Sequence, residues 1–339
     1  MTLTRRNLLR GSLKAVGAAA GVTAGAGLLS SVAGERSLIG SSFAAAPSAA
    51  VQTAGVYRFT VGTLEVTALL DGYFDADPSL VPEFDRQVVD QLYQAQFRDL
   101  PGEKVRIGVN CFVINTGDKL VLVDSGTADK YGPTMGRLPE NLRAAGIAPE
   151  SIDAILITHM HIDHISGISS IDGKALFPNA ELIVHKADWD YWHDDGAMAK
   201  VSKTMQDISL HSRAMALPYK KRLTLIEKDG EILPGIEAMA LPGHTPGHTG
   251  FLLRSAGQEV LIWGDVIHFT ALQFARPDWR VVFDTDMDQA EQTRRRMLDR
   301  VAADRVAVLG SHLDFPGLGH VAREGDNFRY IPSTWQYQV

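Results

Sequence analysis

Four side chains that can bind metal ions lie within one short segment, Thr158-His159-Met160-His161-Ile162-Asp163-His164. Imidazole nitrogen and carboxylate oxygen are preferred ligands of zinc and similar divalent ions. In a segment of alternating direction, His159 and His161 point to one place while Asp163 and His164 turn toward a neighbouring one. A single histidine would be interpreted as a surface or core residue, but four ligands together after a strand favour a site for two metal ions.

Three later side chains are candidates to complete the ligand sets of two ions: His244, Asp265 and His312. Each follows a predicted strand, over residues 236–241, 259–263 and 305–309 respectively. Loops that leave strand ends are where α/β sheets usually carry their chemistry. We therefore expect these three side chains to meet the His-rich segment at one edge of the sheets.

The strands and helices that must position these ligands predict an α/β protein. Further strands are expected over residues 57–62, 64–70, 111–115, 119–124, 152–157, 182–185, 223–227 and 249–254, with a turn at 71–72. Helices are expected over 139–145, 186–192 and 286–303, and over 85–97 inside an insertion at 75–101. Residues 196–220 are polar and give no clear pattern. Strand clusters interleaved with helices favour two sheets packed between helical layers.

The H-x-H-x-D-H segment with a later His, Asp and His resembles the metallo-β-lactamase superfamily. The strand that ends in Asp124-Ser125-Gly126 resembles an early strand of that superfamily, which supports the fold without adding a ligand. Along most of residues 55–332 the chain resembles a subgroup, methyl parathion hydrolase and related lactonases. The stretches that carry this finer resemblance are residues 132–138, 177–180, 243–249 and 311–317.

The resemblance implies a metallo-β-lactamase αββα sandwich, with two mixed sheets between helical layers. It implies one ion held by His159, His161 and His244, and a second by Asp163, His164 and His312, with Asp265 bridging them. Two divalent metal ions per chain are expected, zinc first, although manganese, cobalt or iron accept the same ligands. Relatives of this kind are often homodimers, so a homodimer is an expectation by analogy.

A water shared by two such ions loses a proton near neutral pH, because metal binding lowers its pKa to about 7. The resulting hydroxide is the expected nucleophile, which makes Asp163 and Asp265 catalytic through the ions they hold. His268 is a further catalytic candidate, because it stands three residues after Asp265, where the organophosphate hydrolases carry an aliphatic residue. It could contact the leaving group, narrow the pocket or be a buried structural histidine. This departure favours lactone or aryl ester hydrolysis over efficient organophosphate hydrolysis.

The expected substrate is a small, neutral, apolar ester or lactone, because no Arg or Lys cluster accompanies the motifs. Aromatic side chains near the ligands are the candidate pocket residues: Trp189, Trp192, Phe269 and Phe274, with Tyr191. Three alternatives remain on the same scaffold. They are β-lactam hydrolysis, an iron-dependent redox enzyme of the persulfide dioxygenase or flavo-diiron kind, and a catalytically silent binding protein.

Composition and charge narrow the function further. Hydrophobic residues make up 45% and charged residues 22%, which is typical of a globular protein. The net charge is -7 and no later segment concentrates Lys and Arg, so nucleic acid is not an expected partner. The run 294–296, all arginine, is interpreted as a solvated helix face. The single cysteine, Cys111, lies in a predicted buried strand and cannot form an internal disulfide.

Residues 1–50 have the pattern of an export signal. Arg5 and Arg6 precede an Ala- and Gly-rich apolar stretch, with small-residue cleavage sites at 44–46 or 48–50. The arginine pair resembles a twin-arginine signal. We therefore expect a periplasmic or secreted protein, a single domain over residues 51–339 and no stable membrane anchor after processing. Retention as an N-terminal anchor is the alternative, but the stretch lacks the leucine-rich character of a spanning helix.

Overall fold

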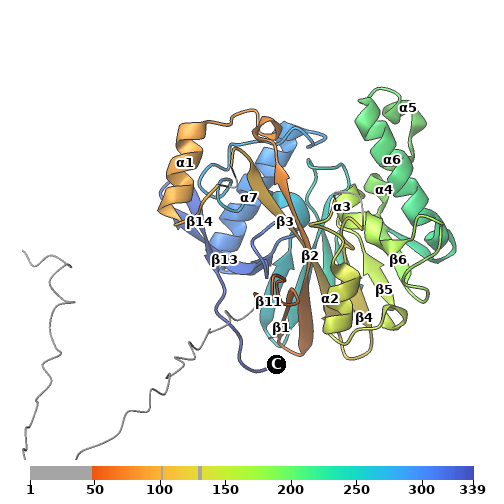
Figure 1. Ribbon diagram of the computed structural model, residues 1–339. Coiled ribbons are helices and arrows are strands. Elements are labelled where there is room, and N and C mark those ends of the chain that lie inside the picture. Colours follow the sequence, from red (N-terminus) through yellow and green to blue (C-terminus); the bar gives the residue numbers. More distant parts are fainter. Residues whose placement is uncertain (1–47, 101, 129–131) are drawn as a thin grey trace, which may run out of the picture. The chain divides into compact units, whose positions relative to one another are not determined.

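Two β-sheets lie at the centre of the computed structural model, which describes residues 48–100, 102–128 and 132–339 (Figure 1). The first sheet has seven strands in chain order. They are β1 Val56–Val61, β2 Leu64–Ala76, β3 Val105–Asn115, β4 Leu120–Val123, β5 Ala154–Leu156, β6 Glu181–His185 and β7 Leu223–Ile226. Strands β1 to β4 pair antiparallel, and β4 to β7 pair parallel. The predicted export signal falls almost wholly outside the described residues.

The second sheet also has seven strands, in the order β14-β13-β12-β11-β10-β9-β8. They are β8 Gly230–Leu233, β9 Ile236–Ala240, β10 Thr249–Ser255, β11 Gln258–Ile262, β12 Ala307–Leu309, β13 Leu318–Glu324 and β14 Asn327–Pro332. Strand β10 is antiparallel to both β9 and β11, and β11 is parallel to β12. The carboxyl ends of β9, β11 and β12 therefore lie at the same edge of the sheet.

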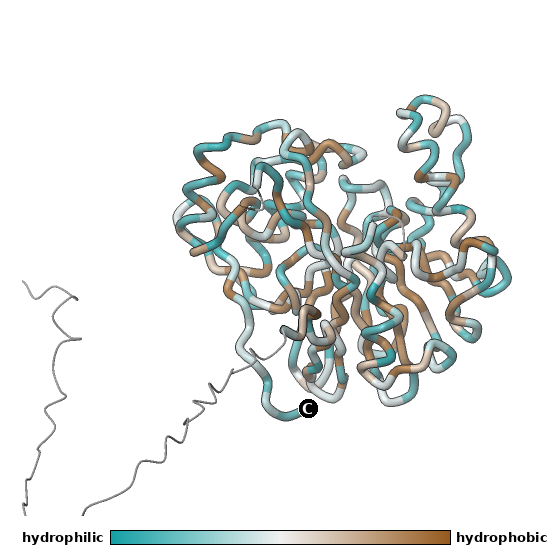
Figure 2. The backbone as a smooth tube through the Cα atoms, viewed as in Figure 1, coloured by the Kyte–Doolittle hydropathy of each residue, from teal (hydrophilic) through white to brown (hydrophobic). Residues whose placement is uncertain are grey.

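Alternate side chains of the two sheets form the central core. In β1, Tyr57, Phe59 and Val61 are buried while their neighbours are half-buried, as expected for a strand with one face inward. Phe251 and Leu253 of β10 belong to the same core from the other sheet. A fully buried side chain of this kind contributes about 1.5–3 kcal/mol to folding. Figure 2 shows the hydrophobic residues gathered along these strands.

Helices cover the outer face of each sheet. The first sheet packs against α2 Leu138–Ala144, α3 Ile162–Ile165, α4 Lys186–His193, α5 Asp195–Met198 and α6 Lys203–Ala216. The second sheet packs against α7 Met287–Asp304, whose Met297 and Leu298 contact the strands. These four layers confirm the expected αββα sandwich. Cys111 is buried in β3, as predicted.

The predicted insertion covers one end of the sandwich. It contains the short helix η2 Pro78–Leu80 and the helix α1 Arg86–Ala95, which begins where Asp85 caps its first turn. Val89 and Tyr93 of α1 form a separate core with Trp279. Because this core joins the insertion to the segment that follows Asp265, the insertion also forms part of the wall above the sheet edge.

The expected turn at residues 71–72 was wrong, because β2 runs through it with a change of register between Leu70 and Gly72. The buried Asp71 carboxylate accepts hydrogen bonds from the backbone N–H groups of Thr127 and Leu138. It therefore ties a later loop to β2 instead of forming a turn. Strands β8, β13 and β14 were not predicted.

The interpretation of residues 294–296 as a solvated helix face was wrong for Arg294. Arg295 and Arg296 are exposed, but Arg294 is 1% exposed. It lies four residues after Ala290 and four before Leu298, both buried, so helical spacing turns it toward the sheet. Among the described residues, no helix is long and apolar enough to cross a membrane.

Candidate metal centre

The His-rich segment changes conformation in its middle. Residues 157–161 form no helix or strand after β5, His161 has an extended backbone, and α3 begins directly after it, so Asp163 and His164 lie on a helical turn. The turn packs against Ser125, whose N–H donates to the carbonyl of His164 at 2.7 Å. A Cβ atom on Gly167 would lie 2.0 Å from the carbonyl oxygen of Ser125, so this approach requires glycine.

The first predicted ligand set converges as expected. Nε2 of His244 lies 3.0 Å from Nε2 of His159 and 2.9 Å from Nδ1 of His161. All three rings are buried. Nitrogen atoms this close, facing one common point, match the ligands that one tetrahedral cation would take.

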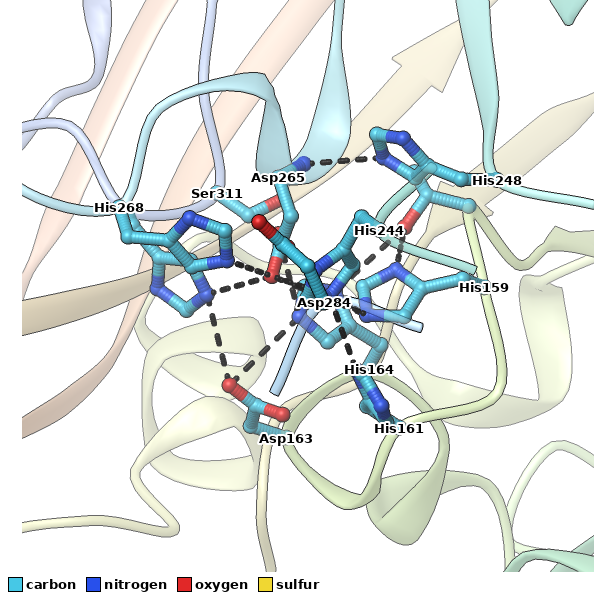
Figure 3. A network of polar contacts seen from close by, with 12 residues as sticks. His159, His161, Asp163, His164, His244, His248, Asp265, His268, Asp284 and Ser311 are labelled. Atoms are coloured by element: carbon cyan, nitrogen blue, oxygen red, sulfur yellow. Dashed lines mark hydrogen bonds and ion pairs between the residues drawn. The ribbon is translucent and has the colours of Figure 1, made fainter. Parts of the chain in front are cut away.

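The second set lies beside the first. Oδ2 of Asp163 is 3.6 Å from Nε2 of His164 and 3.4 Å from Nε2 of His312. Asp265 reaches both sets, since its Oδ1 is 3.3 Å from Nε2 of His164 and its Oδ2 is 3.3 Å from Nε2 of His244. Figure 3 shows Asp265 between the two groups. Asp265 is therefore placed to bridge two ions.

Buried atoms without hydrogen-bond partners test whether the residues fit metal ions. Nε2 of His164 and Oδ1 of Asp265 are buried and make no hydrogen bond within the described residues. Leaving such a group unsatisfied costs about 1–3 kcal/mol. A cation between them would remove this cost, and the imidazole and carboxylate donors match divalent ions. The site fits the two ions that the sequence predicts.

The outer nitrogen of four ligand histidines is held by another protein group. Each Nδ1 lies within 3.1 Å of its partner: His159 with Oγ1 of Thr158, His164 with Oδ2 of Asp124, His244 with Oδ1 of Asp284, and His312 with the carbonyl of Gly108. Such contacts hold the ring and leave the Nε2 lone pair free for a metal ion. Asp124 also accepts a hydrogen bond from the Thr158 hydroxyl, so it supports the site without entering it.

His248 supports the candidate ligands without joining them. Its Nε2 accepts a hydrogen bond from the N–H of Asp265 at 3.0 Å, and its Nδ1 lies 2.9 Å from the carbonyl of Leu241. Burial and the neighbouring His244 lower the pKa of His248 to about 3, so the ring is neutral. His248 thereby ties the loop after β9 to the backbone of the bridging residue.

His268 lies against Asp265 on the wall of a cavity. Its Nε2 is 3.2 Å from Oδ2 of Asp265, and its ring stacks on that of His312 with centroids 5.4 Å apart. Its Nδ1 makes no hydrogen bond to the described residues. Burial, only partly opposed by Asp265, lowers the pKa of His268 to about 4. The ring is therefore neutral at physiological pH and faces the space where a substrate would lie.

The cavity above the ligands has a volume of about 400 Å³ and is largely apolar. That volume lies within the range of small-molecule sites. Its described lining contains no Lys or Arg. The lining residues other than ligands and His268 are Phe74, Leu80, Ile107, Ile162, Ser202, Thr204, Met205, Ile208, Val282 and Phe283.

None of the four predicted pocket aromatics lines this cavity. Trp192 is fully buried behind His161, with ring centroids 5.2 Å apart. Trp189 stacks on His193 beside a separate surface hollow. Phe269 belongs to the core under α1, and Phe274 to the core under α7. The cavity wall is instead formed by Phe74 and Phe283 together with aliphatic side chains and Met205.

Helix α6 supplies a wall of the cavity that the sequence did not predict. Met205 and Ile208 face the cavity, and Ser212 donates its hydroxyl to the carbonyl of Met160. The spacing of these residues is helical, so the signal was present in the segment. The many polar residues around it concealed the pattern.

The charges of the ligands predict a pH dependence of metal binding. Burial disfavours protonated His244, but hydrogen bonds and charges from Asp265 and Asp284 outweigh it and raise the pKa to about 9. Neighbouring carboxylates also outweigh burial at His164 and His312, and they raise the pKa of both imidazole rings. Without a metal ion the His244 ring holds a second proton at pH 7, and metal binding must release that proton.

We expect the affinity for zinc to increase as the pH rises from about 6 toward the His244 pKa of about 9. Binding should release protons over this range, and the release should decline at higher pH. Calorimetric titration of the metal-free protein in buffers of different ionisation enthalpy measures the number of protons. An affinity that does not change with pH, without proton release, would contradict this protonation state.

Comparison with known proteins gives a consistent result. The sequence profile of the metallo-beta-lactamase superfamily matches residues 105–312. An N-acyl homoserine lactonase from a Bacillus species is 26% identical over 231 residues, which cover 62% of this chain and 84% of the lactonase.

Two solved structures are similar over most of their length. The hydrolase AbOPH, described as a member of the beta lactamase superfamily, has a TM-score of 0.80 and 32% identity with this chain. The similarity covers 84% of this chain and 100% of AbOPH. The dizinc quorum-quenching lactonase AidC, in complex with the product N-hexnoyl-L-homoserine, has a TM-score of 0.78 and 26% identity. It is matched over 84% of this chain and 99% of its own.

Proposed function

Because the chain belongs to the metallo-beta-lactamase superfamily, we propose that it is a two-metal hydrolase whose main substrates are lactones. The general activity, that of a metal-dependent hydrolase, is supported by the family and by lactonase and hydrolase relatives. The observation that carries the proposal is Asp265, which contacts both ligand sets on the wall of an apolar cavity. The finer resemblance to methyl parathion hydrolase remains part of the proposal.

The ligands would hold two divalent ions as the resemblance implies. One set is His159, His161 and His244, the other is Asp163, His164 and His312, and Asp265 is shared. Bound ions of this kind lower the pKa of a shared water to about 7 and polarise the carbonyl that is attacked. Complete assembly of the second set favours hydrolysis over the mononuclear dioxygenase alternative.

The protein's own groups would orient the substrate and handle protons. Burial raises the pKa of Asp163, but His164 and His312 outweigh it and hold the pKa well below its usual range. Asp163 is therefore a carboxylate at neutral pH, the form that would bind a cation beside the reacting bond. The neutral His268 ring can donate an N–H hydrogen bond to a substrate oxygen. It carries no negative charge that would repel that oxygen. The apolar wall excludes water from the rest of the cavity.

The substrate follows from the cavity's chemistry. A neutral lactone with an acyl chain or aromatic ring would place its ester near Asp265 and its apolar part against Met205 and Ile208. A charged acid would meet no Lys or Arg in the described lining. The homoserine lactones named for the relatives have this combination of a polar ring and an apolar chain.

A substrate panel on the zinc-loaded protein tests the proposed function. We expect the highest kcat/KM for N-hexanoyl homoserine lactone or dihydrocoumarin, slower hydrolysis of paraoxon, and none of nitrocefin. Protein that cleaves neither lactones nor paraoxon would refute the assignment, and rapid nitrocefin hydrolysis would favour a β-lactamase. Oxygen uptake with one tightly bound iron would instead favour the redox alternative.

His268→Leu should change the relative rates of the two substrate classes. Leucine removes the N–H group and the contact with Asp265 while keeping an apolar wall, so lactone hydrolysis should fall about tenfold. Paraoxon hydrolysis should be equal or faster, since a phosphotriester needs more room than a flat lactone. Steady-state kinetics on both substrates measure the ratio, with Met205→Leu as a control for cavity shape. An equal loss on both substrates would show that His268 acts through the metal site alone.

We also propose export through the twin-arginine pathway, since Arg5 and Arg6 precede the apolar stretch. This part of the chain lies outside the described residues. Cell fractionation of the native chain and of Arg5→Lys/Arg6→Lys would test it, with cytoplasmic retention of the variant expected. The homodimer implied by resemblance can be tested by light scattering.

A further inference from the structure

The ligand His244 is held from behind by a carboxylate that the motifs do not include. Oδ1 of Asp284 lies 2.7 Å from Nδ1 of His244, and Asp284 is 7% exposed. The other face of His244 presents Nε2 to the remaining ligands. Since a carboxylate can only accept a hydrogen bond, Asp284 fixes a proton on Nδ1, and Nε2 is the nitrogen that presents its lone pair to a cation.

A buried arginine lies behind this carboxylate. Nη2 of Arg294 is 3.8 Å from Oδ2 of Asp284, and each side chain is 1% exposed. Arg294 therefore places a positive charge beside the Asp284 carboxylate in the interior of the protein. The ion pair therefore holds Asp284 by the carboxylate oxygen that does not face His244.

Arg294 also reaches the segment that carries the bridging ligand. Its Nε donates to the carbonyl of Val266, the residue after Asp265, at 3.0 Å. Its Nη1 donates to the carbonyls of Pro277 and Trp279 at 3.0 and 2.9 Å. One guanidinium thus connects the loop of Asp265 with the carboxylate behind His244.

The backbone holds the same two segments together. The N–H groups of Thr285 and Asp286 donate to the carbonyls of His244 and Gly243, both at 2.9 Å. Gly243 has a φ of +130°, and a Cβ atom there would lie 2.3 Å from the backbone nitrogen of Ala290 in α7. The loop of His244 is therefore seated on the beginning of α7, the helix that carries Arg294.

We propose that Asp284 and Arg294 are positioning residues of the metal centre, which hold His244 and Asp265 in the orientation that binds the ions. Asp284 orients the imidazole ring through Nδ1, and Arg294 lies against Asp284 while it anchors the Asp265 loop. The inference rests on the proposed metal centre, but it is independent of which ester is the substrate.

Asp284→Asn tests the inference, because asparagine has nearly the same volume but carries no charge. Competition with a chromophoric chelator should show about 10- to 100-fold weaker zinc binding for one of the two ions, the range seen when such outer partners are lost. The visible spectrum of the cobalt-loaded protein should change for the same ion. Arg294→Lys keeps the charge but loses the fork of donors, and should weaken binding to a smaller extent.

The controls are Asp299→Asn and Arg295→Lys, which make the same changes at exposed positions of α7 and should leave zinc affinity unchanged. Circular dichroism and thermal unfolding of the metal-free proteins separate folding from metal binding. If Asp284→Asn does not fold, Arg294→Lys decides the question by the same measurements.

Two results would overturn the inference. One is that Asp284→Asn and Arg294→Lys both keep the zinc affinity and the cobalt spectrum of the wild-type protein. The other is a loss of stability in the metal-free variants without a change in affinity or spectrum, which would mean a purely structural ion pair. Wild-type protein that binds two ions but cleaves no lactone would refute the proposed substrate and leave this inference intact. Wild-type protein that binds no ions would refute both.

Discussion

Asp265→Ala is expected to lose at least about 10³-fold in kcat/KM on every substrate, because a shared carboxylate stabilises both ions. Its Oδ1 lies 3.3 Å from Nε2 of His164, and its Oδ2 lies 3.0 Å from Nε2 of His312. Without these contacts, two cations would lie side by side with no shared negative charge. Metal content should therefore fall together with activity.

Kinetics and elemental analysis of the same preparation measure this effect. Asp172→Ala is the matched control, because Asp172 is an exposed carboxylate paired with Lys174, and it should keep wild-type activity. Asp265→Asn, which retains one ligand oxygen, should keep more metal than the alanine variant. Retained turnover in Asp265→Ala would show that the bridging role is misassigned.

Removal of the metal ions should abolish hydrolysis and also lower thermal stability. An ion present at 1,000 times its dissociation constant stabilises the folded protein by about 4 kcal/mol. For a domain of this size such a loss corresponds to a decrease in Tm of about 5–15 °C. The buried histidines and carboxylates of the site would then face one another without a cation between them.

Dialysis against a chelator, followed by activity and calorimetric measurements, tests this expectation. Addition of zinc or cobalt should restore both activity and Tm, whereas magnesium, which prefers oxygen ligands, should not. Protein that remains fully active when elemental analysis finds no metal would contradict the proposed chemistry. An unchanged Tm would contradict tight binding of the ions to the folded protein.

The convergence of the candidate ligands could be predicted from the sequence because each of them depends on a local pattern. His159, His161, Asp163 and His164 follow one strand, and a short helical turn at α3 is enough to divide them between two points. His244, Asp265 and His312 could be placed together by one rule. Strands that run in the same direction have their carboxyl ends at the same edge of a sheet. Strands β9, β11 and β12 obey it.

The cavity wall could not be predicted in the same way, because it depends on how distant segments pack. Aromatic residues near the ligands were expected to line it, but Trp192 fills the space between α4 and the first sheet. Met205 and Val282, which do line it, come from segments without a strong pattern. Which apolar side chains remain beside a cavity is decided by what is left after the cores are filled.

Asp284 and Arg294 were missed for different reasons. Asp284 follows no strand, and its role exists only because the loop of His244 folds back onto α7. Arg294 stands in a run of three arginines, which resembles a solvated surface. Its spacing from Ala290 and Leu298 was the signal that could have placed it inside.

The origin of the ligands in the two sheets has a consequence for the order of assembly. His159 to His164 come from a loop of the first sheet, whereas His244, Asp265 and His312 come from loops of the second. A nascent chain in which only the first sheet has folded holds a complete set of candidate ligands for neither ion. Binding of either ion would therefore have to wait until both sheets have folded and packed together, and bound ions would then cross-link the two sheets.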